Sequence, residues 1–142
     1  MNLLPLNDFP LQTYDKVRYA DTDRQGHVNN ANFSIYFETG RVEIFYNPEN
    51  ALLVENASFV IASLKLDYLK EIHWPGRVEI GTGILRVGNS SIRIYQQLFQ
   101  NDECVARAEA TVVQVDGSTR RSTPLSDTAK ARLNGWLIEG NE

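Results

Sequence analysis

Residues 19–41, YADTDRQGHVNNANFSIYFETGR, stand between two segments with different hydrophobic periods, and this change decides the fold. Before them, QTYDKVRYA (12–20) alternates between apolar and polar side chains, which predicts a strand. After the polar residues, the segment 32–47 carries an apolar stripe at three- and four-residue steps, made of Phe33, Phe37, Gly40 and Ile44. This spacing predicts a helix, which Pro48 ends and for which the candidate caps are Asn29, Asn30 and Asn32.

Downstream of Pro48 the hydrophobic period shortens to two, as in strands. Four segments alternate in this way, namely 58–69, 77–87, 91–99 and 103–115. Short turns at 88–89 and 101–102 favour antiparallel pairing of consecutive strands. A short closing helix is expected over 126–140, with Ser126 as its cap. One long helix against five antiparallel strands predicts an α+β fold.

One face of the last strand carries small side chains, at Ala106, Ala108, Ala110 and Val112. Such a face leaves room for a bulky element to approach the sheet closely. The aromatic helix 32–47 is the candidate for that element.

Composition sets limits on the partners of the chain. Its 142 residues predict a single domain over 1–142, and the net charge of -4 favours neither nucleic acid nor an anionic membrane as the main partner. The single cysteine, Cys104, excludes an intrachain disulfide and a multi-cysteine zinc site. The first residues lack the pattern of a signal peptide, and no apolar run approaches the roughly 20 residues that span a bilayer. A cytoplasmic protein is expected.

The motif in 19–41 and the order of elements together resemble the hotdog-fold acyl-CoA thioesterases of the 4-hydroxybenzoyl-CoA thioesterase type. The pattern of that family is an Asp, two variable residues, a Gly and then an Asn before an aromatic-rich helix; it is matched here by Asp23, Gly26, Asn32 and Phe33. Residues 59–99 look like the next three strands of the family, so the resemblance spans nearly the whole chain. It implies a five-stranded antiparallel sheet wrapped around a central helix, and a homodimer or homotetramer with active sites between subunits.

The resemblance also implies the chemistry, hydrolysis of an acyl-CoA to a free acid and CoA without a cofactor. Asp23 would attack the thioester carbonyl or take a proton from water, and the sequence leaves both routes open. The backbone amide of Asn30, at the start of the helix, would hold the oxyanion. Gly26 would allow a tight turn and a close approach of the substrate to the main chain.

Three other residues near the motif have two interpretations each. Asp21 is a neighbour of the catalytic carboxylate or, as we expect, simply exposed. His27 orients substrate or water, or is a structural histidine; it belongs to a His-Val-Asn-Asn run shared with the fatty acyl carrier-protein thioesterases, which have Asn where this chain has Gln25. Glu38 is a reserve catalytic candidate or forms a salt bridge with Arg41.

Polar and charged residues of the sequence are also candidate ligands for a metal ion and for the substrate. Asp21, Asp23 and His27 offer a set of divalent-metal ligands, but no further ligands cluster near them in the sequence and thioester hydrolysis needs no metal, so none is predicted. The phosphates of CoA could be met at strand ends and turns by Arg86, Ser90, Ser91, Arg120 and Arg121, although for any one of them we favour an ordinary solvated position. The aromatic residues Tyr68, Trp74 and Tyr95 either line an acyl pocket or pack in the core.

Two other functions remain open at this point. A hotdog protein that binds acyl-CoA without cleaving it would share the fold. A dehydratase or hydratase acting on the double bond of an acyl thioester would use His27 and Glu38 as its acid–base pair.

Overall fold

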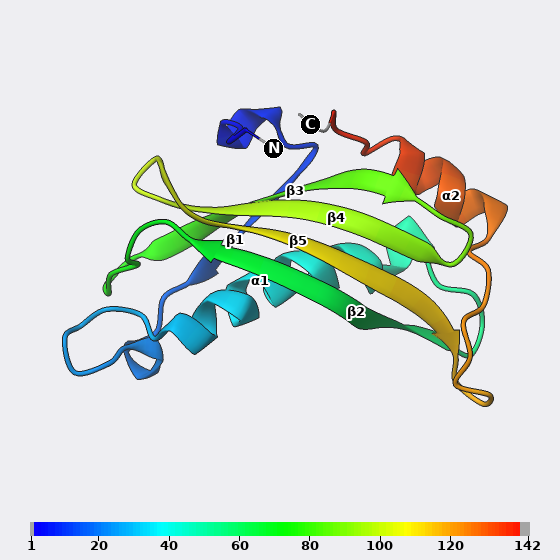
Figure 1. Ribbon diagram of the computed structural model, residues 1–142, viewed down its shortest axis with the longest axis horizontal. Coiled ribbons are helices and arrows are strands. Elements are labelled where there is room, and N and C mark those ends of the chain that lie inside the picture. The colour runs from blue at the N-terminus through cyan, green and yellow to red at the C-terminus, as the bar shows by residue number, and fades with distance from the viewer. Residues whose placement is uncertain (1, 140–142) are drawn as a thin grey trace.

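The computed structural model describes residues 2–139 and confirms an α+β fold with one five-stranded antiparallel sheet. The strands pair in the order β1-β3-β4-β5-β2, and the sheet curves around α1 (Figure 1). The elements are β1 (Leu11–Lys16), α1 (Asn30–Phe45), β2 (Ala57–Tyr68), β3 (Arg77–Val87), β4 (Ser91–Gln100), β5 (Glu103–Asp116) and α2 (Asp127–Asn134).

Helix α1 packs against the small side chains of β5, as predicted. Phe33 and Phe37 are buried in one apolar cluster with Ala106 and Ala108. Further along the helix, Gly40 brings the backbone close to β3 and β4: a Cβ added at Gly40 would lie 2.7 Å from Ile80 Cγ2. Small residues on both elements therefore fix how closely the helix and the sheet approach each other.

The opposite face of the sheet is covered by the N-terminal segment and by the residues around α2 (Figure 1). Phe9 packs there on Tyr95 and Phe99, with Leu4 and Ile138 against them. Within residues 2–139, no helix combines the length and the apolar character needed to cross a lipid bilayer.

The segment before α1 differs from its predicted course. The strand predicted over 12–20 ends at Lys16, and residues 19–21 form a 3-10 helix instead. Helix α1 starts at Asn30, two residues before its predicted start, because the Asn29 side chain accepts a hydrogen bond from the amide of Ala31 (2.9 Å). Asn29 is thus the cap among the three asparagines that were candidates.

Strand β2 forms an edge of the sheet and carries exposed apolar side chains. Val60, Ile61, Leu64 and Tyr68 are between 38% and 52% exposed. A register shift between Ile61 and Ser63 interrupts the alternation that the sequence predicted for this strand. Apolar residues on the outer side of α1, including Ile35, Val42 and Tyr46, are exposed to a similar degree. Exposed apolar side chains therefore recur along both β2 and α1.

Candidate active site

The start of α1 leaves one backbone amide without an acceptor. The amide of Ala31 donates to the Asn29 side chain, and the amide of Asn32 donates to the Asn29 carbonyl (2.9 Å). The amide of Asn30 finds no acceptor within residues 2–139. Because the helix dipole adds partial positive charge at this end, the free amide of Asn30 is suited to bind an anionic oxygen.

Asp23 opens a tight turn that ends at His27. The Asp23 amide donates to the His27 carbonyl (2.8 Å), and Gly26 has a φ of 79°. A positive φ is the reason for glycine at this position, since other residues adopt it at a cost. The Asp23 Oδ1 atom accepts hydrogen bonds from the amides of Gln25 (2.8 Å) and His27 (3.3 Å), while no group within residues 2–139 donates to Oδ2. One carboxylate oxygen is held in place and the other is free to react.

A cleft of about 320 Å³ brings these groups together. Its wall is formed by the turn, by the first residues of α1 and by the end of β2 with the segment after it. The residues that line it are Asp23, Gln25, His27, Val28, Asn30, Phe33, Tyr68, Leu69, Lys70 and Glu71. All three predicted catalytic residues, Asp23, His27 and Asn30, therefore contribute to one cleft.

Tyr68 holds the two sides of the cleft together. Its hydroxyl donates to the Asn30 carbonyl (3.2 Å), and its ring packs edge-on against Phe33 at a centroid distance of 5.0 Å. The first turn of α1 is in this way attached to the end of β2. Of the other aromatic residues considered for an acyl pocket, Tyr95 is buried with Phe9 on the opposite face, and Trp74 is exposed beside Tyr19.

Asp21 is buried, so the prediction that it is exposed was wrong. Its side chain is 3% exposed and accepts hydrogen bonds from the Tyr36 hydroxyl (2.8 Å) and from the amide and guanidinium of Arg18 (3.0 Å each). Burial alone raises the pKa of Asp21, but these hydrogen bonds outweigh burial and leave the pKa below its usual range. The same burial and the hydrogen bond to Asp21 raise the pKa of Tyr36.

The backbone of Asp21 also supports the start of the helix. Its carbonyl accepts hydrogen bonds from the Asn29 amide (2.8 Å) and from the Asn32 side chain (2.8 Å). Asp21 is thus a structural residue that fixes α1 against the turn, and it does not line the cleft.

His27 and Glu38 have surroundings that the sequence did not predict. The His27 Nε2 atom lies 3.2 Å from Oε2 of Glu71, and its ring packs edge-on against His73. Glu38 is exposed, while Arg41 is buried and donates to the Gln96 side chain (3.3 Å). The predicted Glu38–Arg41 salt bridge is not among the ion pairs of residues 2–139.

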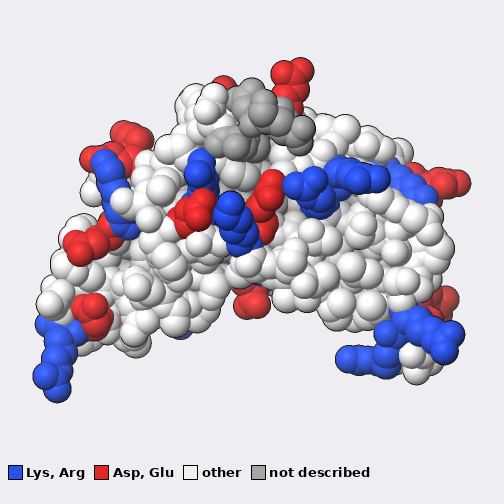
Figure 2. Space-filling view, in the orientation of Figure 1, with Lys and Arg blue, Asp and Glu red and all other residues white. Residues whose placement is uncertain are grey.

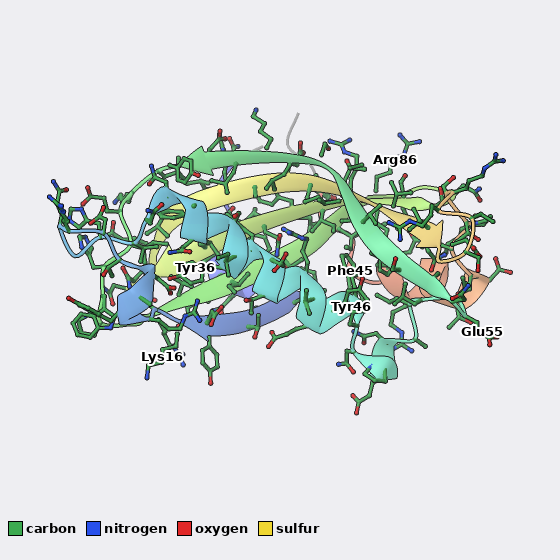
Figure 3. All side chains as sticks on the ribbon, turned by 90° about the horizontal axis from the view of Figure 1, so that it is seen from below. Lys16, Tyr36, Phe45, Tyr46, Glu55 and Arg86 are labelled. Atoms are coloured by element: carbon green, nitrogen blue, oxygen red, sulfur yellow. The ribbon has the colours of Figure 1, made fainter. Side chains whose placement is uncertain are left out.

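The residues predicted to bind the phosphates of CoA are not near the cleft. Arg86, Ser90 and Ser91 lie around the β3–β4 turn, and Figure 3 shows Arg86 at the end of the sheet where α1 ends. Arg120 and Arg121 follow β5, at the same end as the start of β2. Figure 2 shows basic side chains on the loop after β5, at the lower right, and acidic and basic side chains mixed along the sheet. A single chain does not bring these residues to Asp23.

The geometry of the cleft suits hydrolysis of an activated carbonyl. A cleft open to water is lined by Asp23, whose Oδ2 accepts no hydrogen bond within residues 2–139, and by Asn30, whose amide has no acceptor in the same range. The first can act as nucleophile or general base, and the second can stabilise negative charge on a carbonyl oxygen.

Known proteins resemble the chain over most of its length. The family profile of the thioesterase-like superfamily matches residues 17–133. The acyl-CoA thioesterase YbgC of Helicobacter pylori is 34% identical over 97 residues, which cover 66% of this chain and 67% of the relative.

Two solved structures combine a close fold match with 30% sequence identity. A predicted thioesterase from Bacillus stearothermophilus superposes with a TM-score of 0.83, covering 92% of this chain and 98% of its own. A thioesterase from Thermus thermophilus, solved in complex with coenzyme A and Zn, superposes with a TM-score of 0.77 over 90% of this chain and 95% of its own.

Proposed function

The chain belongs to the thioesterase-like superfamily, and on this premise we propose that it hydrolyses acyl-CoA through Asp23 and the amide of Asn30. This membership confirms, at the level of the superfamily, the prediction of a hotdog-fold thioesterase. It also confirms the prediction that the chain is a thioester hydrolase. The narrower 4-hydroxybenzoyl-CoA thioesterase type stays a prediction. The observation that carries the proposal is that the Oδ2 atom of Asp23 and the Asn30 amide, both without a hydrogen-bond partner in the described part of the chain, lie on one cleft.

Asp23 supplies the group that attacks or activates water. In the general-base route its Oδ2 takes a proton from water, the hydroxide adds to the thioester carbon, and the C–S bond then breaks as the thiolate leaves and is protonated. In the nucleophilic route Oδ2 itself attacks, CoA leaves, and water hydrolyses the resulting anhydride. Rapid mixing distinguishes them, because only the anhydride route releases one equivalent of CoA before the free acid.

The Asn30 amide supplies the oxyanion donor. As the carbonyl carbon becomes tetrahedral, its oxygen gains negative charge, and a fixed backbone N–H strengthens its hydrogen bond as that charge grows. The helix dipole adds to this stabilisation. The Asn29 cap and the Tyr68 hydroxyl bond support this role, because they hold the first turn of α1 in place. We assign His27 to the wall of the cleft and give it no proton-transfer step, since its Nε2 faces Glu71.

Acyl-CoA is the substrate class we propose. The Helicobacter pylori relative is named an acyl-CoA thioesterase, and the Thermus thermophilus neighbour was solved with coenzyme A. In this chain, Arg86, Arg120 and Arg121 are at the end of the sheet away from the cleft, so they can bind the phosphates only if a second copy brings them to it.

A homo-oligomer is part of the same proposal. The edge strand β2 and the outer side of α1 carry exposed apolar residues, and one of them, Tyr68, also lines the cleft. A second copy packed on them would bury apolar area and complete the wall of the site. Sedimentation velocity tests this proposal, and a monomer at micromolar concentration would contradict it.

Release of free thiol from a panel of acyl-CoAs tests the function. Short, long and aromatic acyl groups are each incubated with the protein, and the thiol is followed with a chromogenic reagent. Steady release that Asp23→Asn abolishes is the expected result. Binding of acyl-CoA without thiol release would favour a non-catalytic acyl-CoA-binding protein. A change in the acyl double bond without thiol release would favour a dehydratase or hydratase.

A further inference from the structure

Both histidines of the chain lie side by side at the edge of the cleft. His27 ends the turn before α1, and His73 lies between β2 and β3, yet the two residues pair in an antiparallel bridge. Because the Val28 amide donates to the Ile72 carbonyl (2.8 Å), His27 and His73 form a non-hydrogen-bonded antiparallel pair. Side chains approach most closely in such pairs, and here the ring centroids are 5.0 Å apart.

Glu71 completes a group of three ligands. It precedes His73 by two residues, so in an extended segment the two side chains point to the same side. Its Oε2 atom lies 3.2 Å from Nε2 of His27. One ligand atom from each of His27, Glu71 and His73 can be chosen so that all lie within 4.8 Å of one another.

The backbone under the group is fixed by buried neighbours. The amide of His73 donates to the side chain of Gln100 (2.9 Å), and the Gln100 amide group donates back to the His73 carbonyl (2.9 Å). Gln100, Val28 and Ile72 are all buried. The side chains of Glu71 and His73 are exposed, while that of His27 is partly buried. The anchors are thus rigid and the ligand atoms accessible, so little ordering is needed for a metal ion to bind.

We propose that His27, Glu71 and His73 form a binding site for a divalent transition-metal ion of the zinc class. Two imidazole nitrogens and a carboxylate oxygen are a donor set that Zn²⁺ prefers, and three protein ligands leave a fourth position for water. Tetrahedral bonds of about 2.0–2.1 Å place ligand atoms about 3.3–3.4 Å apart. The separation of 3.2 Å between His27 and Glu71 is close to this value, and the ligand atom of the exposed His73, now within 4.8 Å of the other two, would have to move to the same spacing.

The site differs from the metal ligands considered from the sequence. Asp21 is buried against Arg18 and Tyr36 and offers no free oxygen, so the set of Asp21, Asp23 and His27 is excluded. A bound ion would connect the turn that carries Asp23 to the segment after β2, and His27 and Glu71 both line the cleft. The metal would therefore join two walls of the cleft.

Titration of the full, untagged, metal-free chain with Co²⁺ tests the site. We expect one ion per chain, with the intense visible absorption of a four- or five-coordinate ion, displaced by Zn²⁺. Zn²⁺ should also raise the melting temperature by several degrees, because it binds the folded chain. His73→Ala should weaken binding by more than about 100-fold, since losing a residue that only hydrogen-bonds to a metal ligand already costs about 10–100-fold.

Glu71→Gln and Glu103→Gln form the matched pair of variants. Both carboxylates are exposed, and Glu103 is paired with Lys70 outside the group of three ligands. Glu71→Gln should weaken Co²⁺ binding at least tenfold, and Glu103→Gln should leave it within twofold. Because Glu71 is exposed, its variant remains informative if His73→Ala fails to fold. An absent Co²⁺ spectrum, or equal binding by Glu71→Gln and the wild type, would overturn the proposal.

Discussion

Asp21 and Asp23 are separated by one residue and have opposite environments. Asp21 lies beneath the start of α1, where Arg18 and Tyr36 donate to both of its oxygens. Asp23 is exposed on the cleft, with Oδ1 held by the turn and no donor to Oδ2 among residues 2–139. Both oxygens of the buried carboxylate accept hydrogen bonds and are shielded from a substrate, whereas Oδ2 of the exposed one accepts none within residues 2–139. Residue type alone therefore does not separate the two aspartates; their burial and hydrogen-bond partners do, and they favour Asp23 for the proposed catalytic role.

The largest expected effect is on turnover when Asp23 is changed. Asp23→Asn keeps the Oδ1 acceptor for the turn but removes the nucleophile or base, so thioesterase turnover should fall by about 10³-fold. The free energy of unfolding, measured by urea denaturation, should stay within about 0.5 kcal/mol of the wild type, as for other surface positions. Asp8→Asn, which changes an exposed aspartate of the N-terminal segment, is the control. Turnover near the wild-type rate in folded Asp23→Asn would remove Asp23 from the mechanism.

The next effect in size is on stability when Asp21 is changed. Asp21→Ala leaves the Tyr36 hydroxyl and the Arg18 amide without their acceptor, which should cost about 2–3 kcal/mol of unfolding free energy. Little of this comes from the guanidinium of Arg18, because that side chain is largely exposed. Urea denaturation followed by circular dichroism measures the loss. Wild-type stability would show that the buried hydrogen bonds contribute nothing net.

A smaller loss is expected at the hydroxyl that contacts Asp21. Tyr36→Phe removes one hydrogen bond to a buried carboxylate and keeps the ring in the apolar cluster, so it should cost about 1.5 kcal/mol. A double-mutant cycle with Asp21→Ala isolates the coupling between the two side chains. Additive losses would contradict the direct interaction.

The smallest effect is a dependence of stability on pH. The pKa of Asp21 is lower in the folded chain than in an unfolded one, so its contribution to stability is present above about pH 4 and is lost as the pH falls through the folded value. Unfolding midpoints measured between about pH 7 and pH 3 should therefore fall less steeply for Asp21→Asn than for the wild type. The comparison between these two chains is needed because Glu103 and Asp116 also have lowered pKa values. Parallel curves would contradict the assignment.

The sequence was sufficient for the fold because the evidence for it is local. The change of period after Pro48 and the small face of β5 predicted the strands and the packing of α1, and β3 spans the predicted residues. The motif likewise indicated Asp23, His27 and Asn30, which share a cleft. These features depend on residues close in sequence or on a recurring spacing.

What the sequence did not reveal depends on contacts between distant segments. Asp21 was expected to be exposed because its partner Tyr36 lies 15 residues away, beside the apolar stripe of α1. The group of His27, Glu71 and His73 was missed for the same reason, since only the bridge between residues 27 and 73 brings them together. The one sequence feature that pointed to this group is that both histidines stand in polar segments next to apolar residues.

Gly40 also bears on how an acyl tail can lie. A Cβ at Gly40 would be 2.7 Å from Ile80 and 2.8 Å from Gln96. At its midpoint α1 therefore packs directly on the sheet, with no room for an acyl tail between them. The cleft at Asp23 is separated there from a second hollow of about 240 Å³ beside β1. Under the proposed mechanism, an acyl tail that starts at Asp23 would stay on the cleft's side of this close contact, where its far boundary would be whatever covers that surface. Under the proposed assembly, selectivity for acyl-chain length is a property of the paired subunits. Substitutions at the interface can then change this selectivity while the turn that carries Asp23 stays the same.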